Sequence, residues 1–503
     1  MIPMTLGHIA SVTGGTLVGA DPSATVTSEF VIDSRRVCPG SMFVAVVGER
    51  VDGHSFAAAA VAAGAAGVLG TRVVPGVPCV VVGSEVDALA LLARSVLDAL
   101  PSAVVAGITG SSGKTSTKDL CASLVERLGP TIAPAGSFNT EYGLPLTVLR
   151  ADEATRYLVL EMSARGIGHI AYLCGIAPPR YGVVLNVGHA HAGEFGGLDQ
   201  VAIAKGELVE ALPSSGVAIL NADDPRVAAM ASRTNARVVT FGLGGVPPHG
   251  SLDGVPPHGV PPHGSNARLT SLERVNRAID SATGLAGPDF RAVNVRLDEL
   301  GRARFTLVTP EGSAAVALRV HGAHQVPNSL AAAALASALG LGLDDIADGL
   351  SGAVARSRWR MEVTTRLDGV VIINDAYNAN PESVRAALDS LGHMARDGRA
   401  FAVLGHMAEL GSSSAPSHAE VGAYAASKGL TQLIAVGDEA VPVLDGARSV
   451  SSWHGEAVAV PDGAAAVELL RDQLKPGDVV LVKASRAASL ESAAAELLAE
   501  AGQ

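Results

Sequence analysis

The sequence predicts an α/β protein of three domains, which we expect at residues 1–100, 101–354 and 355–503. The first is a small α/β domain, the second contains a mostly parallel sheet, and the third is Rossmann-like. The chain length of 503 residues corresponds to about three domains at roughly 100–200 residues each. Apolar strand-like runs alternate with helical patterns, which is typical of parallel sheets. A Gly/Ser-rich loop also joins one such run to a helix.

The elements follow in chain order. In the first domain we expect strands at Phe43–Val46 and Cys79–Val82 and an Ala-rich helix at Phe56–Ala63. The second domain begins with a strand at Ala103–Ile108 and a helix at Lys114–Leu128, which ends because Gly129 and Pro130 follow it. Its other expected elements are strands at Tyr157–Glu161, Gly182–Asn186, Val217–Leu220, Arg291–Leu297, Ala303–Val308 and Ala314–Val320 and a helix at Pro327–Leu339. The third domain has four expected strands, without a GxGxxG signature, at Val370–Asp375, Phe401–Leu404, Leu433–Val436 and Val479–Val482.

The composition of the chain limits the classes of partner that it can bind. The net charge of −12 argues against a broad nucleic-acid surface but permits a local basic pocket for a phosphorylated small molecule. The N-terminus lacks the features of a signal peptide, and the most apolar stretch, Phe56–Gly70, is too short to span a membrane. We therefore expect a cytoplasmic protein with no nucleic-acid or membrane partner. The four cysteines are scattered without a CxxC pair, and we expect buried, reduced thiols at Cys38, Cys79, Cys121 and Cys174.

Residues 243–266 interrupt the second domain with a repeat. The tetrapeptide PPHG occurs three times, beginning at Pro247, Pro256 and Pro261. Proline pairs and glycines build neither a helix nor a ladder. The repeat histidines are potential metal ligands, but we expect a surface insertion without a catalytic role.

The glycine-rich loop spans Gly107–Ser116 and predicts a phosphate site. Backbone N–H groups of such a turn and of the following helix N-terminus bind anionic oxygens. We expect Lys114 to reach the β- and γ-phosphates of a nucleotide and the Thr115 hydroxyl to hold Mg²⁺. The match to G-x-x-x-x-G-K-[ST] is imperfect, because the first glycine position is occupied by Ile108.

Further polar residues follow the expected strands, where ligands of open α/β sheets bind. Glu161 ends one strand, and Asn186 ends another and leads to His191, with His189 as the alternative to His191. Lys205 alone is an ordinary helix lysine. The first domain offers two weak candidate sets for a diphosphate, Asp33–Arg35 and Asp52–Phe56, and the third offers Asn374–Pro381 for a ribose or polar substrate.

In this order the motifs resemble the Mur ligase family over nearly the whole chain. The phosphate loop TGSSGKTSTK is shared across that family. Six further motifs carry the resemblance: GSFNTEYGLPLT from Gly136, EFGGLDQVAIAKGEL from Glu194, NADD from Asn221, YNANP from Tyr377, VLGHMAELG from Val403 and LVKASR from Leu481.

The resemblance implies an ATP-dependent amide ligase. YNANP favours the family activity that joins D-alanyl-D-alanine to UDP-N-acetylmuramoyl-tripeptide. The three domains are then expected to bind the UDP-sugar, to bind ATP, and to close over ATP while bringing the dipeptide. ATP, Mg²⁺ (two ions) and a CO₂-derived carbamate on Lys205 are the implied cofactors, and we expect a monomer that acts on small molecules.

The resemblance also assigns roles to individual residues. Lys114, Glu161, His191 and Lys205 are the implied catalytic residues, and Thr115, Glu161, His191 and carbamylated Lys205 the implied metal ligands. The implied ATP contacts are Thr109, Gly110, Ser111, Ser112, Gly113, Lys114, Thr115, Ser116, His324, Asn328, Arg360, and Asn374 or Asp375. The implied contacts of the UDP-linked substrate are Asp33, Ser34, Arg35, His54, Asn139 and Thr140. The implied dipeptide contacts are Tyr377, Asn378, Asn380, Ser485 and Arg486.

Electrostatics is consistent with the carbamate. An ammonium about 5 Å from Mg²⁺ is repelled by roughly 5–7 kcal/mol at an effective dielectric constant near 20. A carbamate reverses the charge and supplies the oxygen ligands that a hard cation prefers. Its formation requires a neutral amine, so the pKa of Lys205 must fall well below its usual value.

Two other functions are compatible with parts of the pattern. One is a related ligase that adds a single amino acid to a muramoyl peptide, or glutamate to a folate. The other is a phosphate-loop nucleotide switch that forms no bond. YNANP argues against the first, and the three α/β domains with Lys205 in its KGE setting argue against the second.

Overall fold

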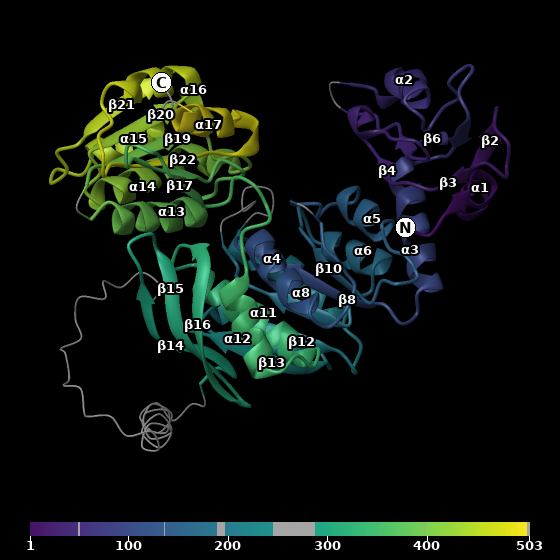
Figure 1. The fold of residues 1–503 in the computed structure, drawn as a ribbon, viewed down its shortest axis with the longest axis horizontal. Helices are drawn as coiled ribbons and strands as arrows, with labels where there is room; N and C mark the ends of the chain where they lie inside the picture. The colour runs from purple at the N-terminus through teal and green to yellow at the C-terminus, as the bar shows by residue number, and fades with distance from the viewer. Residues whose placement is uncertain (49–50, 135, 189–196, 245–286, 397, 500–503) are drawn as a thin grey trace.

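The protein is described by a computed structural model that covers residues 1–48, 51–134, 136–188, 197–244, 287–396 and 398–499. These residues form three lobes, each around its own sheet (Figure 1). The N-terminal lobe, in purple, and the C-terminal lobe, in yellow and light green, lie on opposite sides of the central lobe. The predicted fold class, α/β with a mostly parallel central sheet and a Rossmann-like C-terminal part, is confirmed.

The N-terminal lobe is a five-stranded sheet of order β2-β7-β6-β5-β4. Its strands are β2 (Thr16–Val18), β4 (Phe30–Val31), β5 (Met42–Val44), β6 (Gly67–Gly70) and β7 (Cys79–Val81). Helix α3 (Glu85–Ala99) connects this lobe to the next by packing on α1 (Leu6–Thr13), α5 (Gly143–Val148) and α6 (His169–Ile176). One apolar core therefore continues from the N-terminal lobe into the central lobe.

The central lobe is a nine-stranded sheet of order β16-β15-β14-β13-β12-β11-β8-β10-β9. Its parallel strands are β8 (Val104–Thr109), β9 (Thr131–Ile132), β10 (Tyr157–Glu161), β11 (Tyr181–Val184), β12 (Val217–Asn221), β13 (Arg237–Gly242) and β14 (Phe290–Leu297). Strands β15 (Arg302–Thr309) and β16 (Gly312–His321) extend it antiparallel. Glu161 pairs with Ile108, and Val184 with Thr109, so three carboxyl ends meet at one edge.

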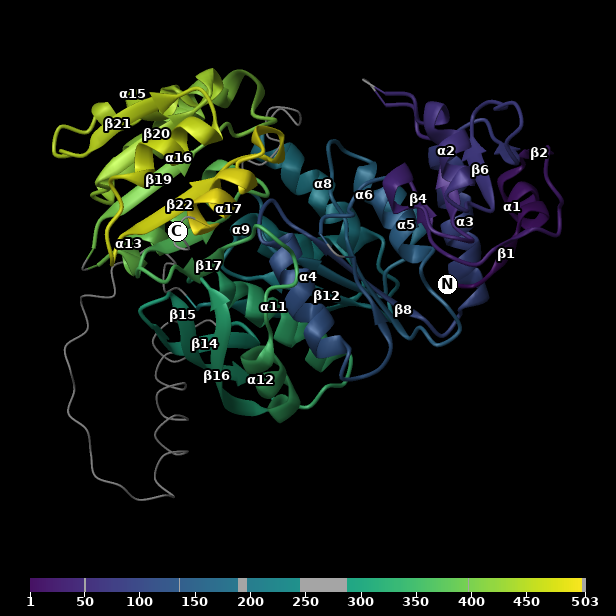
Figure 2. The same ribbon diagram turned by 45° about the horizontal axis from the view of Figure 1, so that its top comes forward.

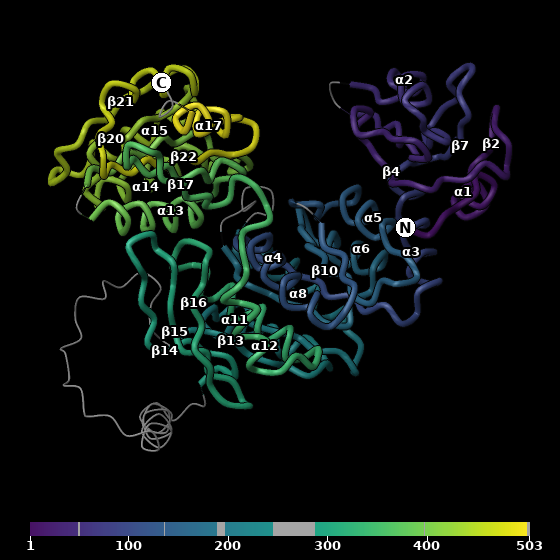
Figure 3. Tube along the Cα trace, viewed as in Figure 1, coloured from purple at the N-terminus to yellow at the C-terminus, as the bar shows by residue number. Residues whose placement is uncertain are grey.

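Helices cover both faces of this sheet (Figure 2). Helix α4 (Lys114–Val125) packs on α11 (Gln325–Ala338) and α12 (Leu343–Gly352), whereas α8 (Leu198–Glu210) packs on α6. From residue 330 to residue 336 the buried part of α11 is alanine and leucine only, which lets helix and sheet approach closely. Figure 3 follows the chain from α12 into the C-terminal lobe.

The C-terminal lobe is a six-stranded sheet of order β17-β18-β22-β19-β20-β21. Its strands are β17 (Glu362–Thr365), β18 (Val371–Asn374), β19 (Ala400–Leu404), β20 (Gln432–Val436), β21 (Glu456–Val460) and β22 (Val479–Lys483). All are parallel except β17, which pairs antiparallel with β18. Asn374 lies beside Val482, so the carboxyl ends of β18 and β22 are adjacent.

Several local predictions need correction. The helix from Lys114 ends at Val125 rather than Leu128, because the residues before Gly129 form a turn. The C-terminal sheet has six strands rather than four. The missed strands β17 and β21 are the two partly exposed edges of the sheet; β17 (EVTT) lacks an apolar run, whereas β21 (EAVAV) is apolar but short. Cys38 is exposed, whereas the other three cysteines are buried as predicted.

Two sequence predictions concern residues outside the described part. His189, His191 and almost all of the PPHG repeat lie in 189–196 and 245–286, which the structure does not describe. Among the residues it does describe, no helix is both long and apolar enough to cross a membrane.

Candidate active site

The phosphate loop is fixed by contacts with the end of β11. Ser112 donates its backbone N–H to Asn186 Oδ1 at 2.9 Å, and Asn186 Nδ2 donates to the carbonyl of Ser112 at 3.2 Å. Gly113 has φ +80°, and a Cβ there would lie 2.7 Å from Asn328 Oδ1, so only glycine fits. Lys114 Nζ donates to the Gly110 carbonyl at 2.7 Å. The loop is thus pre-formed, with its amides at the start of α4.

Glu161 supplies a buried carboxylate beside this loop. Its Oε2 accepts a hydrogen bond from Asn139 Nδ2 at 3.2 Å, but its buried Oε1 has no hydrogen-bond partner. The Thr115 hydroxyl lies 3.0 Å from that of Ser137. An unpartnered buried carboxylate oxygen near a hydroxyl fits a hard cation such as Mg²⁺. In the described ranges, no group of three or more His, Cys, Asp or Glu side chains is placed to hold a metal, and His191 lies outside those ranges.

Lys205 is buried on α8, with an exposed fraction of 3%. Burial lowers the pKa of its ammonium well below the usual value, and the positive charge of Lys114 lowers it further. Burial also lowers the pKa of Lys114, while the carboxylate of Glu161 opposes this. Burial and the positive charge of Lys114 therefore both favour the neutral amine at Lys205.

Glu207, the acidic residue of the KGE sequence that begins at Lys205, has a structural role. Its carboxylate is buried and accepts the backbone N–H groups of Gly168 at 2.5 Å and Ala171 at 2.9 Å. It thereby caps α6, whose N-cap residue Gly168 has no side chain to do so. Helix α8, which carries Lys205, is consequently fixed against α6.

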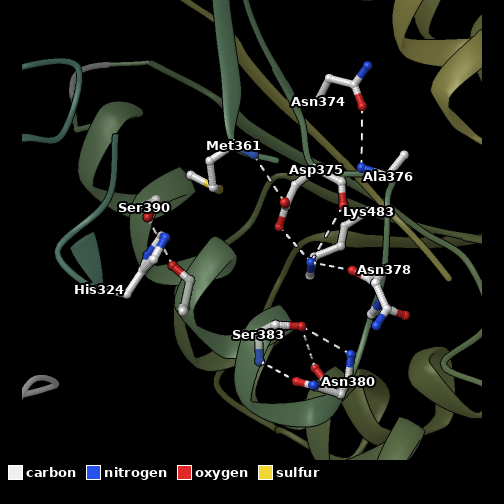
Figure 4. A network of polar contacts seen from close by, with 12 residues as sticks. His324, Met361, Asn374, Asp375, Ala376, Asn378, Asn380, Ser383, Ser390 and Lys483 are labelled. Carbon is white, nitrogen blue, oxygen red and sulfur yellow. Dashed lines mark hydrogen bonds and ion pairs between the residues drawn. The ribbon is translucent and has the colours of Figure 1, made fainter. Parts of the chain in front are cut away.

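The C-terminal lobe contributes a second polar network (Figure 4). Lys483 is buried at the end of β22, and its Nζ lies 2.5 Å from Asp375 Oδ2 and 2.8 Å from the carbonyl of Asn378. Asp375 Oδ1 accepts the backbone N–H of Met361 at 3.1 Å. Asn380 caps helix α13 (Pro381–Met394) through reciprocal bonds with Ser383. Lys483 thus ties the segment after β18 to β22.

Arg360 connects the C-terminal lobe with the central lobe. Its guanidinium lies over the Tyr377 ring, 4.2 Å from the centroid, and Nη2 donates to Ser137 Oγ at 2.7 Å. The linker before it is held on α4, because Arg356 forms a two-pronged ion pair with Glu126 and Asp119 accepts the N–H of Ser357. Helix α4 therefore carries both the phosphate loop and the attachment of the C-terminal lobe.

A cavity of about 1030 Å³ lies among these elements and is bounded by all three lobes. We refer to it as the central cavity. Its walls include residues of the phosphate loop, the end of β10, the start of α3 and the segments after β18 and β22. It is large enough for a nucleotide together with part of a second substrate.

Comparisons with known proteins agree with this architecture. The Mur ligase family catalytic domain matches residues 28–90, the Mur ligase middle domain 108–248, and the Mur ligase glutamate ligase domain 359–486. A UDP-N-acetylmuramoyl-tripeptide--D-alanyl-D-alanine ligase of Mycobacterium tuberculosis is 44% identical, over 99% of this chain and 98% of the relative. The ligase of the same name from Escherichia coli is 34% identical, over 98% and 97%. This chain belongs to the Mur ligase family.

Solved structures of other Mur ligases have the same overall fold. A crystal structure of MurF from Acinetobacter baumannii superposes with a TM-score of 0.80 at 30% identity and covers 99% of each chain. The MurF ligase of Thermotoga maritima in complex with ADP gives a TM-score of 0.74 at 30% identity, covering 95% of this chain and 98% of that one.

In this Mur ligase the structure brings most of the sequence-predicted residues to the central cavity. Those that line it are Ser111, Ser112, Gly113, Lys114, Thr115, Ser116, Asn139, Thr140, Glu161, His324, Asn328, Arg360, Asp375, Tyr377, Asn378, Asn380, Ser485 and Arg486. Thr109 and Lys205 are buried, and neither they nor Gly110 line the cavity. Of the alternatives Asn374 and Asp375, only Asp375 lines it, because the Asn374 side chain accepts the N–H of Ala376.

The residues predicted for the UDP moiety are not brought to this cavity. Arg35 makes a bidentate pair with Asp33, which lowers the pKa of that carboxyl to about 2. Ser34 and Arg35 lie in the short helix Ser34–Arg36, which Asp33 caps. His54 is buried, with Nδ1 2.7 Å from Asp52 Oδ1 and Nε2 accepting the N–H of Thr71. Both ring nitrogens of His54 are therefore engaged within the N-terminal lobe.

Sequence reasoning missed other residues of the cavity wall, among them Ser137, Arg165, Glu409 and Lys483. Ser137, Glu409 and Lys483 lie inside motifs that carry the family resemblance, and Lys483 is the last residue of a strand, where ligands of such sheets gather. Arg165 and Glu409 lie on loops, and no periodicity predicts which way a loop side chain points.

Proposed function

We propose that this chain is an ATP-dependent ligase that joins D-alanyl-D-alanine to UDP-N-acetylmuramoyl-tripeptide and so forms the pentapeptide precursor of peptidoglycan. The 44% identity to a full-length relative of that name carries the proposal. The geometry supports it, because the central cavity is bounded by the phosphate loop, the buried carboxylate of Glu161 and polar residues of the C-terminal lobe.

The place of each domain and residue suggests which substrate it binds. We propose an N-terminal domain (1–100) for the UDP-sugar, an ATP-binding domain (101–354), and a C-terminal domain (355–503) for closure and the dipeptide. Asn139 and Thr140 are suited to the peptide end of the UDP-linked substrate, since they line the cavity beside Glu161. Tyr377, Asn378, Ser485 and Arg486 are suited to the dipeptide, because they line the part of the cavity that the C-terminal lobe contributes. A cytoplasmic monomer is consistent with these small-molecule substrates.

The reaction requires activation of a carboxylate, which is a poor acyl donor. The terminal carboxylate of the tripeptide attacks the γ-phosphorus of ATP, ADP leaves, and an acyl phosphate forms. Lys114 and the loop amides stabilise the charge of the transferring group. The amine of D-alanyl-D-alanine then attacks the acyl carbon, phosphate leaves, and the amide forms. Because water also attacks an acyl phosphate, the lobes must close before the first step.

Thr115 and Glu161 are the described residues suited to hold Mg²⁺, and a carbamate on Lys205 would add oxygen ligands. Bound there, the cation would neutralise phosphate charge. The buried, deprotonation-prone amine of Lys205 supports carbamate formation, because only the neutral amine adds to CO₂.

Product analysis tests the proposal. Purified protein is incubated with Mg²⁺-ATP, UDP-N-acetylmuramoyl-tripeptide and D-alanyl-D-alanine, and products are identified by mass spectrometry. ADP that appears only with both co-substrates, and a UDP-sugar that gains one dehydrated dipeptide, is the expected result. ATP hydrolysis that is independent of both substrates, or better use of a single amino acid, would contradict it.

A further inference from the structure

Glu409 lies on the loop after β19 and lines the central cavity from the C-terminal lobe. Its φ of +64° is in the left-handed region, which non-glycine residues rarely adopt. Among the described residues only four other non-glycine residues share this feature, and of those only Met361 also lines the cavity. A backbone held in a disfavoured state at a cavity wall points to a functional constraint.

The loop around Glu409 is held by contacts that surround it. Met407 and Leu410 on either side are buried in the apolar core. His418 is fully buried, accepts the N–H of Met407 at its Nε2 at 2.9 Å, and donates from Nδ1 to the carbonyl of Ser414 at 2.8 Å. The carbonyl of His406 accepts the N–H of Ser485 at 3.0 Å. With Met407 and Leu410 packed into the core, Ala408 and Glu409 are the residues of this loop that line the cavity, and Glu409 is the one that carries a charge.

The C-terminal lobe presents three carboxylates to the cavity: Asp375, Glu382 and Glu409. The charge of Asp375 is balanced by Lys483. Glu382 lies against Gly188 on the phosphate-loop side, since a Cβ on that glycine would be 2.9 Å from its Oε1. Glu409 lines the same cavity as Lys114, and its negative charge opposes the lowering of the Lys114 pKa that burial causes. Glu409 is therefore a carboxylate of the C-terminal lobe that shares the cavity with the phosphate loop.

The dipeptide, which is the second substrate, needs a carboxylate in the central cavity. The amino group of a dipeptide is mainly an ammonium at neutral pH, because the pKa of such groups is about 7.7–8.0. It must reach the acyl carbon, which lies next to the transferred phosphate and hence near Lys114. It must also lose a proton, since an ammonium has no electron pair with which to attack.

We propose that Glu409 binds the ammonium of the incoming dipeptide and accepts its proton; this rests on the proposed function. One N–H proton passes to the Glu409 carboxylate, and the nitrogen electron pair forms the C–N bond to the acyl carbon. The C–O bond to phosphate then breaks, and the phosphate leaves with that electron pair and takes a second proton from the nitrogen. The products are the amide, hydrogen phosphate and protonated Glu409, which returns its proton to solvent.

The test compares two nucleophiles in Glu409→Gln. Hydroxylamine is largely uncharged at neutral pH and traps an acyl phosphate as a hydroxamate without help from a base. We expect kcat/KM for D-alanyl-D-alanine to fall about 10²–10⁴-fold, as for loss of a general base, while ATP-dependent hydroxamate formation from the UDP-tripeptide stays near the wild-type rate. The remaining dipeptide activity should rise more steeply with pH than in the wild type. Glu468→Gln, the same change on an exposed residue of α16 (Gly463–Arg471), is the control.

Other outcomes overturn the assignment. Equal loss of amide and hydroxamate would place Glu409 in the ATP step, and loss of neither would remove it from the mechanism. Glu409→Gly separates function from folding: glycine favours φ +64°, so this variant should unfold at an equal or higher temperature yet still lose dipeptide activity. A lower unfolding temperature would indicate a structural role instead. If the wild-type protein forms hydroxamate but no amide, the proposed function fails rather than this inference.

Discussion

The ion pair between Lys483 and Asp375 gives the sharpest prediction for stability. Lys483 has a 2% exposed side chain, Asp375 is 14% exposed, and the two charged atoms lie 2.5 Å apart. Replacing Lys483 with Met leaves the carboxylate without its cation and the Asn378 carbonyl without a donor. Removal of one partner from a buried pair costs about 3–5 kcal/mol, and the partial exposure of Asp375 places the expected loss near 3 kcal/mol.

Urea unfolding followed by tryptophan fluorescence measures this loss. The two tryptophans of the chain, Trp359 and Trp453, both flank or belong to the C-terminal lobe, so the signal reports on that lobe. Lys475→Met is the matched control, because Lys475 is exposed in the same lobe and should change stability by no more than about 0.5 kcal/mol.

A double-variant cycle completes the test. Asp375→Asn combined with Lys483→Met should cost less than the sum of the single changes, with a coupling of about 1–3 kcal/mol. Lys483→Met should also raise KM for the dipeptide, because Lys483 positions the Asn378 segment. A loss in Lys483→Met no larger than in Lys475→Met would refute the reasoning that this pair holds the segment after β18.

Three further predictions concern the central and C-terminal lobes. Lys205→Ala should lose ligase activity and regain part of it in millimolar short-chain carboxylate, which occupies the place of the carbamate; full activity without carboxylate would exclude the carbamate. His418 is buried and burial lowers the pKa of its imidazole, so below about pH 6.5 the unfolded chain takes up a proton there that the folded chain does not, and stability falls as the pH falls. Between pH 7 and 5.5 the wild type should therefore lose more stability than His418→Gln, and equal losses would contradict this. Glu207→Ala should destabilise the protein by about 2–4 kcal/mol and speed hydrogen exchange at the start of α6, because two charge-assisted hydrogen bonds are lost. The exposed Glu210→Ala control should cost at most about 1 kcal/mol, and circular dichroism melts compare the two.

Features that contiguous residues encode could be predicted from the sequence alone. Strand, turn and helix around Lys114 follow one another within a few residues, so spacing alone predicts the phosphate loop. The strand at Tyr157–Glu161 is fully predicted because a buried parallel strand requires an unbroken apolar run. Motifs of this kind also carried the family resemblance, which the comparisons confirm.

Which distant side chains meet depends on how the three lobes fold and pack. Arg360 and Ser137 are 223 residues apart, and Lys483 and Asp375 are 108 apart, so their contacts depend on how separate sheets pack. His54 was predicted to contact the UDP-linked substrate, and only the structure shows that both of its ring nitrogens have partners within the N-terminal lobe. The exposure of Glu409 to the cavity depends on Met407 and Leu410 being buried on either side. Periodicity encodes which face of an element is apolar, whereas the direction of a loop side chain is set by long-range packing that no local pattern contains.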